Sequence, residues 1–453
     1  MSKYKILILT LLMGFSTSLT CCAGQINIDL SSSNKDMIKN IAVSKSRPSN
    51  LVMSVNLSKN NSNDYIRNGM YDLSQGDIKK AYFDFKTGYT YAKEDYDKFN
   101  FAKIMASVGI FSLSHQALDD ISDKSLWEKQ AQSLKRIYYP SVLLNETDEA
   151  VVVKALSELS FSNNPNNVDK LVKDYNYSVK SNDFSNFVVA KAYSAKKNNN
   201  ASISYLIYST KKNPNNLNYN LELAKAYSSN KQYGLALGQI NTILNSKFYD
   251  EGFRKEAKKE QFWLKSKDKN DFTSKYYLAK YYAASGEFEH ALKILNALKK
   301  DYSKNSQVFS LLGDVNYNID LNTEARKNYE TALSFNSKNA NALKGLGNIY
   351  SLQKKYRISL EYYQKALKYS QNSVETMVLI ANNFNKLNQQ GVAMDYYQKI
   401  LEIDELNPIA NYQLGLMYKD DENYKVAINY FKKALSVDSG NKEIAKELAE
   451  IEK

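Results

Sequence analysis

The chain has 453 residues, of which 43% are hydrophobic and 24% charged, and this composition excludes an intrinsically disordered protein. It contains only 5 Pro and 16 Gly, too few for a sandwich or barrel built on many tight turns, so helices are favoured. The formal charge of +13 comes almost entirely from lysine, since only six residues are arginine. Arginine is the favoured reader of phosphates and base edges, so nucleic acid is not an expected partner.

The N-terminus has the pattern of an export signal. Lys3 and Lys5 form a short basic region, residues 6–15 are apolar, and small residues follow up to Ala23. The apolar run is too short to remain as a membrane-spanning helix. Residues 1–23 are therefore predicted to be a signal peptide.

Two processing routes fit this junction. Cleavage after Ala23 would release the chain as a periplasmic protein. Alternatively, Cys22 after Leu-Thr-Cys resembles a bacterial lipoprotein signal, and Cys21 is a poorer candidate for the same lipid-bearing residue. The protein would then be membrane-anchored or cell-surface. Both cysteines lie here, so the remainder of the chain has no disulfide. Residues 24–61, rich in Ser, Asn and Lys, are predicted to be a flexible tether.

Helical periodicity begins near residue 62. A small residue, Gly69, is followed after twelve positions by Ala81 and four later by Phe85, a spacing that predicts two helices in close contact. Within residues 62–182 this is the one recognisable hairpin repeat. Residues 98–182 look helical but match the spacing poorly, so they are interpreted as degenerate repeats.

The same spacing recurs over 183–250, with a period of about 34 residues that is typical of helical-hairpin repeats. Ala190 and Ser202 mark the first of two repeats, and Ala224 and Ala236 mark the second. Residues 251–271 then interrupt the period and are predicted to be an inserted helix.

Five further repeats follow without insertion or deletion over residues 272–441, and residues 442–453 are predicted to be a capping helix. Tyrosines at fixed places in the period are interpreted as packing residues, Tyr424 among them. The recurring small, aromatic and alanine positions include Gly313, Ala325, Tyr329, Ala332, Gly347, Tyr350, Tyr363, Ala366, Gly415, Tyr418, Ala427, Phe431 and Ala434.

This pattern of Leu-Gly, Tyr, Ala, Phe and Ala resembles the tetratricopeptide repeat. The resemblance implies an all-α fold, a right-handed superhelical solenoid of antiparallel helical hairpins, in an exported bacterial protein. We number the positions of each repeat from its first residue, at 183, 217, 272, 306, 340, 374 and 408.

In this family ligands lie in a concave groove lined by the first helix of each repeat, so the resemblance implies a partner-binding site there. Its position-9 residues include Lys191, Lys225, Lys280, Asp314, Asn348 and Asn382. The lysines form a ladder suited to acidic segments, and the Asn pair can bind both N–H and C=O of an extended peptide. Lys344 with Asn348 matches the first part of the family's two-carboxylate clamp, but Leu379, Ile409 and Gln413 depart from the rest of it.

Nothing in the sequence indicates catalysis, a cofactor or a metal site. The two histidines lie in different repeats, and no phosphate loop or nucleophile motif occurs. The leading hypothesis is a non-enzymatic interaction scaffold of the bacterial cell envelope that binds an extended peptide or helix of a partner. One alternative is a glycan-binding or enzymatic module within residues 98–182. The other is a lipid-anchored protein that contacts the membrane surface.

Overall fold

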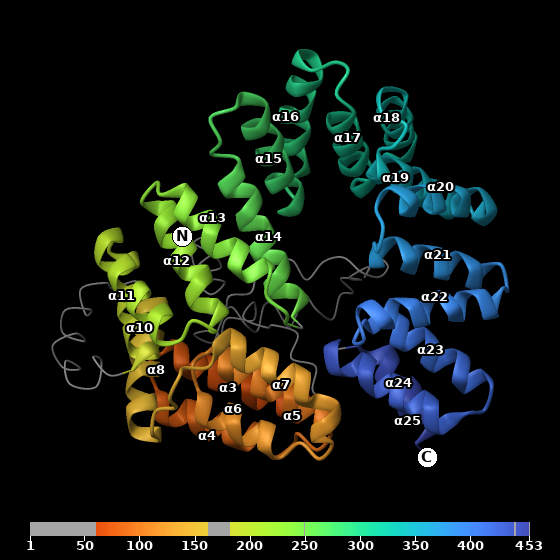
Figure 1. Ribbon diagram of the computed structural model, residues 1–453. Helices are drawn as coiled ribbons and strands as arrows, with labels where there is room; N and C mark the ends of the chain where they lie inside the picture. The colour runs from red at the N-terminus through yellow and green to blue at the C-terminus, as the bar shows by residue number, and fades with distance from the viewer. Residues whose placement is uncertain (1–59, 162–181, 249, 439–440, 453) are drawn as a thin grey trace, which may run out of the picture. The chain divides into compact units, whose positions relative to one another are not determined.

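The computed structural model describes residues 60–161, 182–248, 250–438 and 441–452, and every regular element in these ranges is an α-helix (Figure 1). The predicted all-α class is confirmed. The predicted signal peptide with Cys21 and Cys22, and nearly all of the predicted tether, lie outside the described residues. Among the helices in the ranges given, none combines the length and apolarity needed to cross a membrane.

The chain divides into two units, Met1–Ala257 and Lys258–Lys453. The helices of the first unit pack as consecutive pairs, α3 with α4, α5 with α6, α10 with α11, and α12 with α13. They are α3 (Asn60–Ser74), α4 (Ile78–Tyr89), α5 (Asp95–Ser107), α6 (Phe111–Asp119), α7 (Lys124–Tyr138), α8 (Glu146–Phe161), α10 (Asp183–Ala195), α11 (Asn199–Lys212), α12 (Leu217–Ser229) and α13 (Tyr233–Leu244).

In the α3–α4 pair the small residue Gly69 lies against the large side chain of Phe85, as the sequence spacing predicts. A Cβ atom at Gly69 would overlap the ring of Phe85, so only glycine allows the two helices this approach. The helices α7 and α8 depart from simple pairing. The helix α7 packs against α5 and α12, and α8 packs against α3 and α10. The described part of residues 98–182 is thus helical but only partly organised in hairpins.

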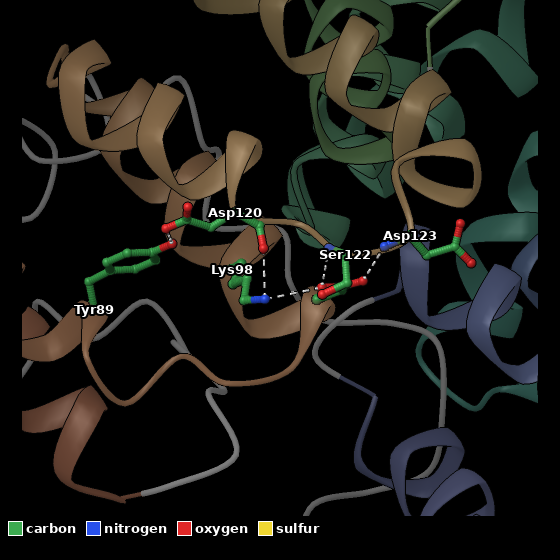
Figure 2. Close-up of polar contacts among 6 residues, drawn as sticks. Tyr89, Lys98, Asp120, Ser122 and Asp123 are labelled. Atoms are coloured by element: carbon green, nitrogen blue, oxygen red, sulfur yellow. Dashed lines mark hydrogen bonds and ion pairs between the residues drawn. The ribbon is translucent and has the colours of Figure 1, made fainter.

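A set of polar contacts ties α4 and α5 to the connection between α6 and α7 (Figure 2). The Asp95 carboxylate accepts the backbone N–H groups of Ser122 at 2.8 Å and Asp123 at 2.9 Å. Burial would raise the pKa of Asp95, but these bonds and Lys98 hold it below its ordinary value. Lys98 also donates to the backbone carbonyl of Asp120. Because Asp95 and Lys98 bond to the backbone of this connection, we interpret the cluster as structural.

The second unit continues as five hairpins and a final helix. The helix α14 (Glu251–Lys265) begins in the first unit and ends in the second. The others are α15 (Asp271–Ala284), α16 (Phe288–Asp301), α17 (Ser306–Asn318), α18 (Asn322–Phe335), α19 (Ala340–Leu352), α20 (Tyr356–Tyr369), α21 (Val374–Lys386), α22 (Gln390–Ile403), α23 (Pro408–Asp420), α24 (Tyr424–Val437) and α25 (Lys442–Ile451).

The recurring positions of these repeats form their core. In three hairpins a glycine at position 8 lies against a fully buried ring at position 24, which a Cβ atom would overlap: Gly313 with Tyr329, Gly347 with Tyr363, and Gly415 with Phe431. The alanines at 325, 332, 366, 427 and 434 are also buried. Tyr350 and Tyr418 are half-buried and stack on Tyr362 and Tyr430. The packing role predicted for Tyr424 is wrong, since its side chain is 47% exposed.

Each hairpin turns at the same place. Position 15 has a left-handed backbone in all seven repeats from residue 183, and it is Gly286 in one of them (φ 76°). The other six are Lys197, Lys231, Asp320, Lys354, Asn388 and Glu422. Asparagine caps the first helix in six of the seven repeats, and Ser373 caps α21.

The helix α14 continues the array rather than only interrupting it. Glu251 stands at position 1 of the repeat that would follow the one starting at Leu217, and position 15 of this register, Lys265, is still helical. A first helix is therefore present without its second helix. The same is true of α25, which begins at position 1 of the repeat that would follow the one starting at Pro408. Single helices of this kind cover the open apolar end of a repeat array.

Candidate functional site

The first helices of the second unit carry five of the seven residues that the sequence selected for partner binding. We call the following set the A face: Lys280 on α15, Asp314 on α17, Lys344 and Asn348 on α19, and Asn382 on α21. All five side chains are partly exposed.

Tyrosine hydroxyls from the second helices hold three of the A-face residues. The Oη of Tyr329 donates to Asp314 Oδ1 at 2.9 Å, and that of Tyr363 donates to Asn348 Oδ1 at 2.8 Å. In the next repeat Tyr397 donates to Asn382 Oδ1 at 2.6 Å. The donor is 15 residues after the acceptor in each case, so position 24 sets the orientation of position 9.

Repeats without a tyrosine at position 24 have neither Asp nor Asn at position 9. The last repeat combines Phe431 with Leu416, and neither side chain has a hydrogen-bonding group. The first repeat of the second unit combines Leu295 with Lys280. A position-24 tyrosine in the second unit is thus accompanied by an acceptor at position 9, because a buried hydroxyl needs one.

The hydrogen bonds fix the amide groups of Asn348 and Asn382. Each Oδ1 accepts a tyrosine hydroxyl, which leaves the two N–H bonds of each Nδ2 for other acceptors. Within the described ranges neither Nδ2 has a hydrogen-bond partner. The A face thus presents two oriented amide donors one repeat apart.

Asp314 lies between two cations and an acid. Burial raises its pKa to about 6, although the Tyr329 hydroxyl and the charges of Lys344 and Lys280 favour the ionised form. The charge of Glu375 raises the pKa further. The Asp314 side chain therefore keeps its proton to a higher pH than an exposed aspartate does.

The predicted lysine ladder is not one row of available cations. Lys191 and Lys225 belong to the first unit, and both pair with Glu222 at 3.0 Å. Lys225 also pairs with Glu256 at 2.9 Å. Lys280 belongs to the second unit, and no carboxylate lies within 4.0 Å of it among the residues described. The role of these lysines in binding stays a prediction.

A hollow in the first unit lies beside one of these ion pairs. It encloses about 420 Å³, open solvent included, and its walls include Phe184, Phe187, Tyr219, Lys191 and Glu222. The two charged groups of its wall already neutralise each other. We therefore favour the A face as the functional surface.

Two residues at positions of the two-carboxylate clamp, Lys344 and Gln413, bond to other side chains of this chain. Lys344 Nζ lies 2.7 Å from Glu375 Oε2, so its charge is neutralised. Gln413 accepts a hydrogen bond from Asn385, and Ile409 is 41% exposed. The two-carboxylate clamp remains incomplete here, as its sequence departures indicate.

The possible metal ligands of the described ranges do not cluster, and His290 lies on the surface. No group of three or more His, Cys, Asp or Glu residues there could hold a metal ion. His290 is 64% exposed, pairs with Glu287 at 3.2 Å and stacks on Tyr282.

Sequence reasoning missed the acids that pair with the lysines, Glu222, Glu256 and Glu375. It also missed the aromatic neighbours of Lys280, which include Phe262 and Tyr277. A search for acids 31 residues after each lysine would have found the acids.

Comparison with known proteins agrees with this architecture. A family model described as tetratricopeptide repeat matches residues 341–373 and 409–441. The chain is thus a helical-repeat protein, and two of its repeats match the tetratricopeptide repeat family, whose members generally serve as non-enzymatic scaffolds for protein–protein interaction.

Several solved structures are similar to the chain. A tetratricopeptide repeat protein from Parabacteroides merdae is 15% identical, with 64% of this chain and 100% of that one covered and a TM-score of 0.36. The APC/C hetero-tetramer Cut9-Hcn1 is 12% identical, with 87% and 90% covered and a TM-score of 0.40. YrrB, described as having an unusual peptide-binding site, is 16% identical, with 54% and 97% covered and a TM-score of 0.29. No curated protein sequence matches significantly.

Proposed function

We propose that the second unit binds an extended segment of a partner protein along its A face, as a non-enzymatic scaffold. The single observation that carries this proposal is the pair of fixed amides at Asn348 and Asn382. Their Nδ2 groups are oriented by Tyr363 and Tyr397 and have no partner within the described ranges. An extended peptide offers backbone carbonyls to such donors whatever its sequence.

Changing both amides to carboxylates tests this role. In N348D/N382D each side chain still accepts its tyrosine hydroxyl, as Asp314 does from Tyr329, but the Nδ2 donors are lost. We select uncharged peptides from a display library on the wild-type chain and measure their Kd by calorimetry. The double variant should bind them at least about tenfold more weakly, because two hydrogen bonds are removed.

The matched control is N328D/N429D, the same change on the second helices α18 and α24. This control should bind the selected peptides as the wild type does, and all variants should keep the wild-type melting temperature. Equal affinity of N348D/N382D and wild type would contradict the proposal, and so would failure to select any peptide.

We further propose that the scaffold acts in the cell envelope. The support is the N-terminal sequence, with Lys3 and Lys5, the apolar residues 6–15 and small residues up to Ala23. Mass spectrometry of the chain from its native cell should find a new N-terminus at residue 24, or a lipid-modified cysteine at 22 or 21. An intact N-terminus at Met1 in all of the protein would refute export by this signal.

A further inference from the structure

Four lysines on the first helices each pair with an acid 31 residues ahead. The next first helix starts one repeat further on, and the acid precedes the matching position by about one helical turn, so the two side chains meet. The four pairs have N–O distances from 2.7 to 3.0 Å: Lys191 with Glu222, Lys225 with Glu256, Lys344 with Glu375, and Lys419 with Glu450.

Lys280 has no acid at this offset. The equivalent place ahead of it is occupied by Leu311, and within the described ranges no carboxylate approaches Lys280 within 4.0 Å. Its Nζ instead lies against aromatic rings, 4.8 Å from the ring centre of Phe262 and 5.8 Å from those of Tyr276 and Tyr277. Contact with rings leaves the net positive charge of Lys280 in place, whereas a paired carboxylate would cancel it.

A second lysine increases the positive charge at this place. Lys265 Nζ lies 5.0 Å from the ring centre of Tyr277, so two cations contact one ring. Burial lowers the pKa of Lys280 and the charge of Lys265 lowers it further, while Asp314 acts in the opposite direction. Lys265, like Lys280, has no carboxylate within 4.0 Å in the described part of the chain. An anion arriving here would meet cations that are already partly stripped of water.

The rings around the lysines are themselves accessible. The helix α15 buries only Ala279, and Phe262, Tyr276 and Tyr277 stay partly exposed. Phe262 stacks on Tyr277 with ring centres 6.3 Å apart. The site therefore combines unpaired positive charge with apolar ring surface.

We propose that Lys280 and Lys265, with Phe262, Tyr276 and Tyr277, bind an acidic residue next to an aromatic residue in the partner's extended segment. The carboxylate replaces the acid that is missing at position 311, and the partner ring packs on the exposed rings. This inference rests on the proposed peptide-binding role of the second unit. It places the acidic residue of the partner's segment beside Lys280 on α15.

The test uses the full chain and an acetylated, amidated heptapeptide, Gly-Ser-Glu-Phe-Glu-Ser-Gly. Calorimetry gives the Kd, and Trp263 reports on the site in a W127F background, because the chain has only two tryptophans. K280M keeps the aliphatic stem and removes the charge. It should bind the peptide at least about tenfold more weakly than the wild type does. The same peptide with both glutamates changed to glutamine should lose binding to a similar extent.

K293M, an exposed lysine on α16, is the matched control and should leave the affinity unchanged. Equal binding by K280M and wild type, or no binding of the acidic peptide to wild type, overturns the assignment. N348D/N382D separates this result from the amide role. If only K280M weakens the heptapeptide, the lysine site stands without the amides. If N348D/N382D weakens the uncharged peptides while K280M leaves the affinity for the heptapeptide unchanged, the amides stand and the lysine site falls.

Discussion

The variant E222Q should lower the free energy of unfolding of the first unit by about 3 kcal/mol at pH 7, and this loss should disappear in acid. Burial alone would raise the pKa of Glu222, but Lys191 and Lys225 lower it from 4.5 to about 2. A carboxylate with a lowered pKa contributes stability above its unfolded pKa and loses it as pH falls through the folded value. The difference between wild type and E222Q should therefore begin to shrink below about pH 4.5.

Urea unfolding between pH 7 and pH 3 measures this difference. In a W263F background, Trp127 is the one tryptophan left, and it is buried in the first unit. The control E128Q changes an exposed glutamate of α7 and should alter stability by less than about 0.5 kcal/mol. A difference that stays constant over this pH range would show that Glu222 acts through packing and not through its charge.

The variant N382L should destabilise α21 and α22 by about 2 kcal/mol, and adding Y397F should recover most of that loss. Leucine removes the acceptor of a hydroxyl whose residue is fully buried. The double variant recreates the Phe431 and Leu416 combination of the last repeat. Y397F alone should cost about 1 kcal/mol, because the partly exposed Asn382 can turn to water.

Hydrogen exchange of the α21 and α22 backbone amides gives the free energy of local opening in the wild type, the two single variants and the double variant. The method applies because a repeat array can open locally. The control pairs N382L with Y396F. Tyr396 stacks on Phe384 and is not bonded to Asn382, so these two changes should add without coupling. Additive effects of N382L and Y397F would contradict the pairing of positions 9 and 24.

The period of the sequence was sufficient to predict the regular hairpins. A glycine such as Gly347 and a ring such as Tyr363 recur at fixed spacing because they touch within one hairpin. Such contacts are local, so their residues stay at constant separation along the chain. The same repeat spacing predicted that Asn348 and Asn382 lie on one face. It did not predict that tyrosine hydroxyls orient their amides.

The irregular part of the first unit was not predictable in this way. The helix α7 packs against α12, and α8 packs against α3, at separations that follow no period. The helix α14 was predicted as an insertion, and its bounds together with the contact between Lys225 and Glu256 show that it continues the register.

The sequence by itself thus determined the all-α class, the period of the repeat and the residues that face one another within each hairpin. Only the tertiary structure decided which lysines are neutralised and which are not. Lys191 and Lys225 meet Glu222, whereas Lys280 meets the rings of Phe262 and Tyr277. The reason is physical: the 31-residue offset is present in the sequence, but only the stacking of successive first helices shows that side chains at this offset meet.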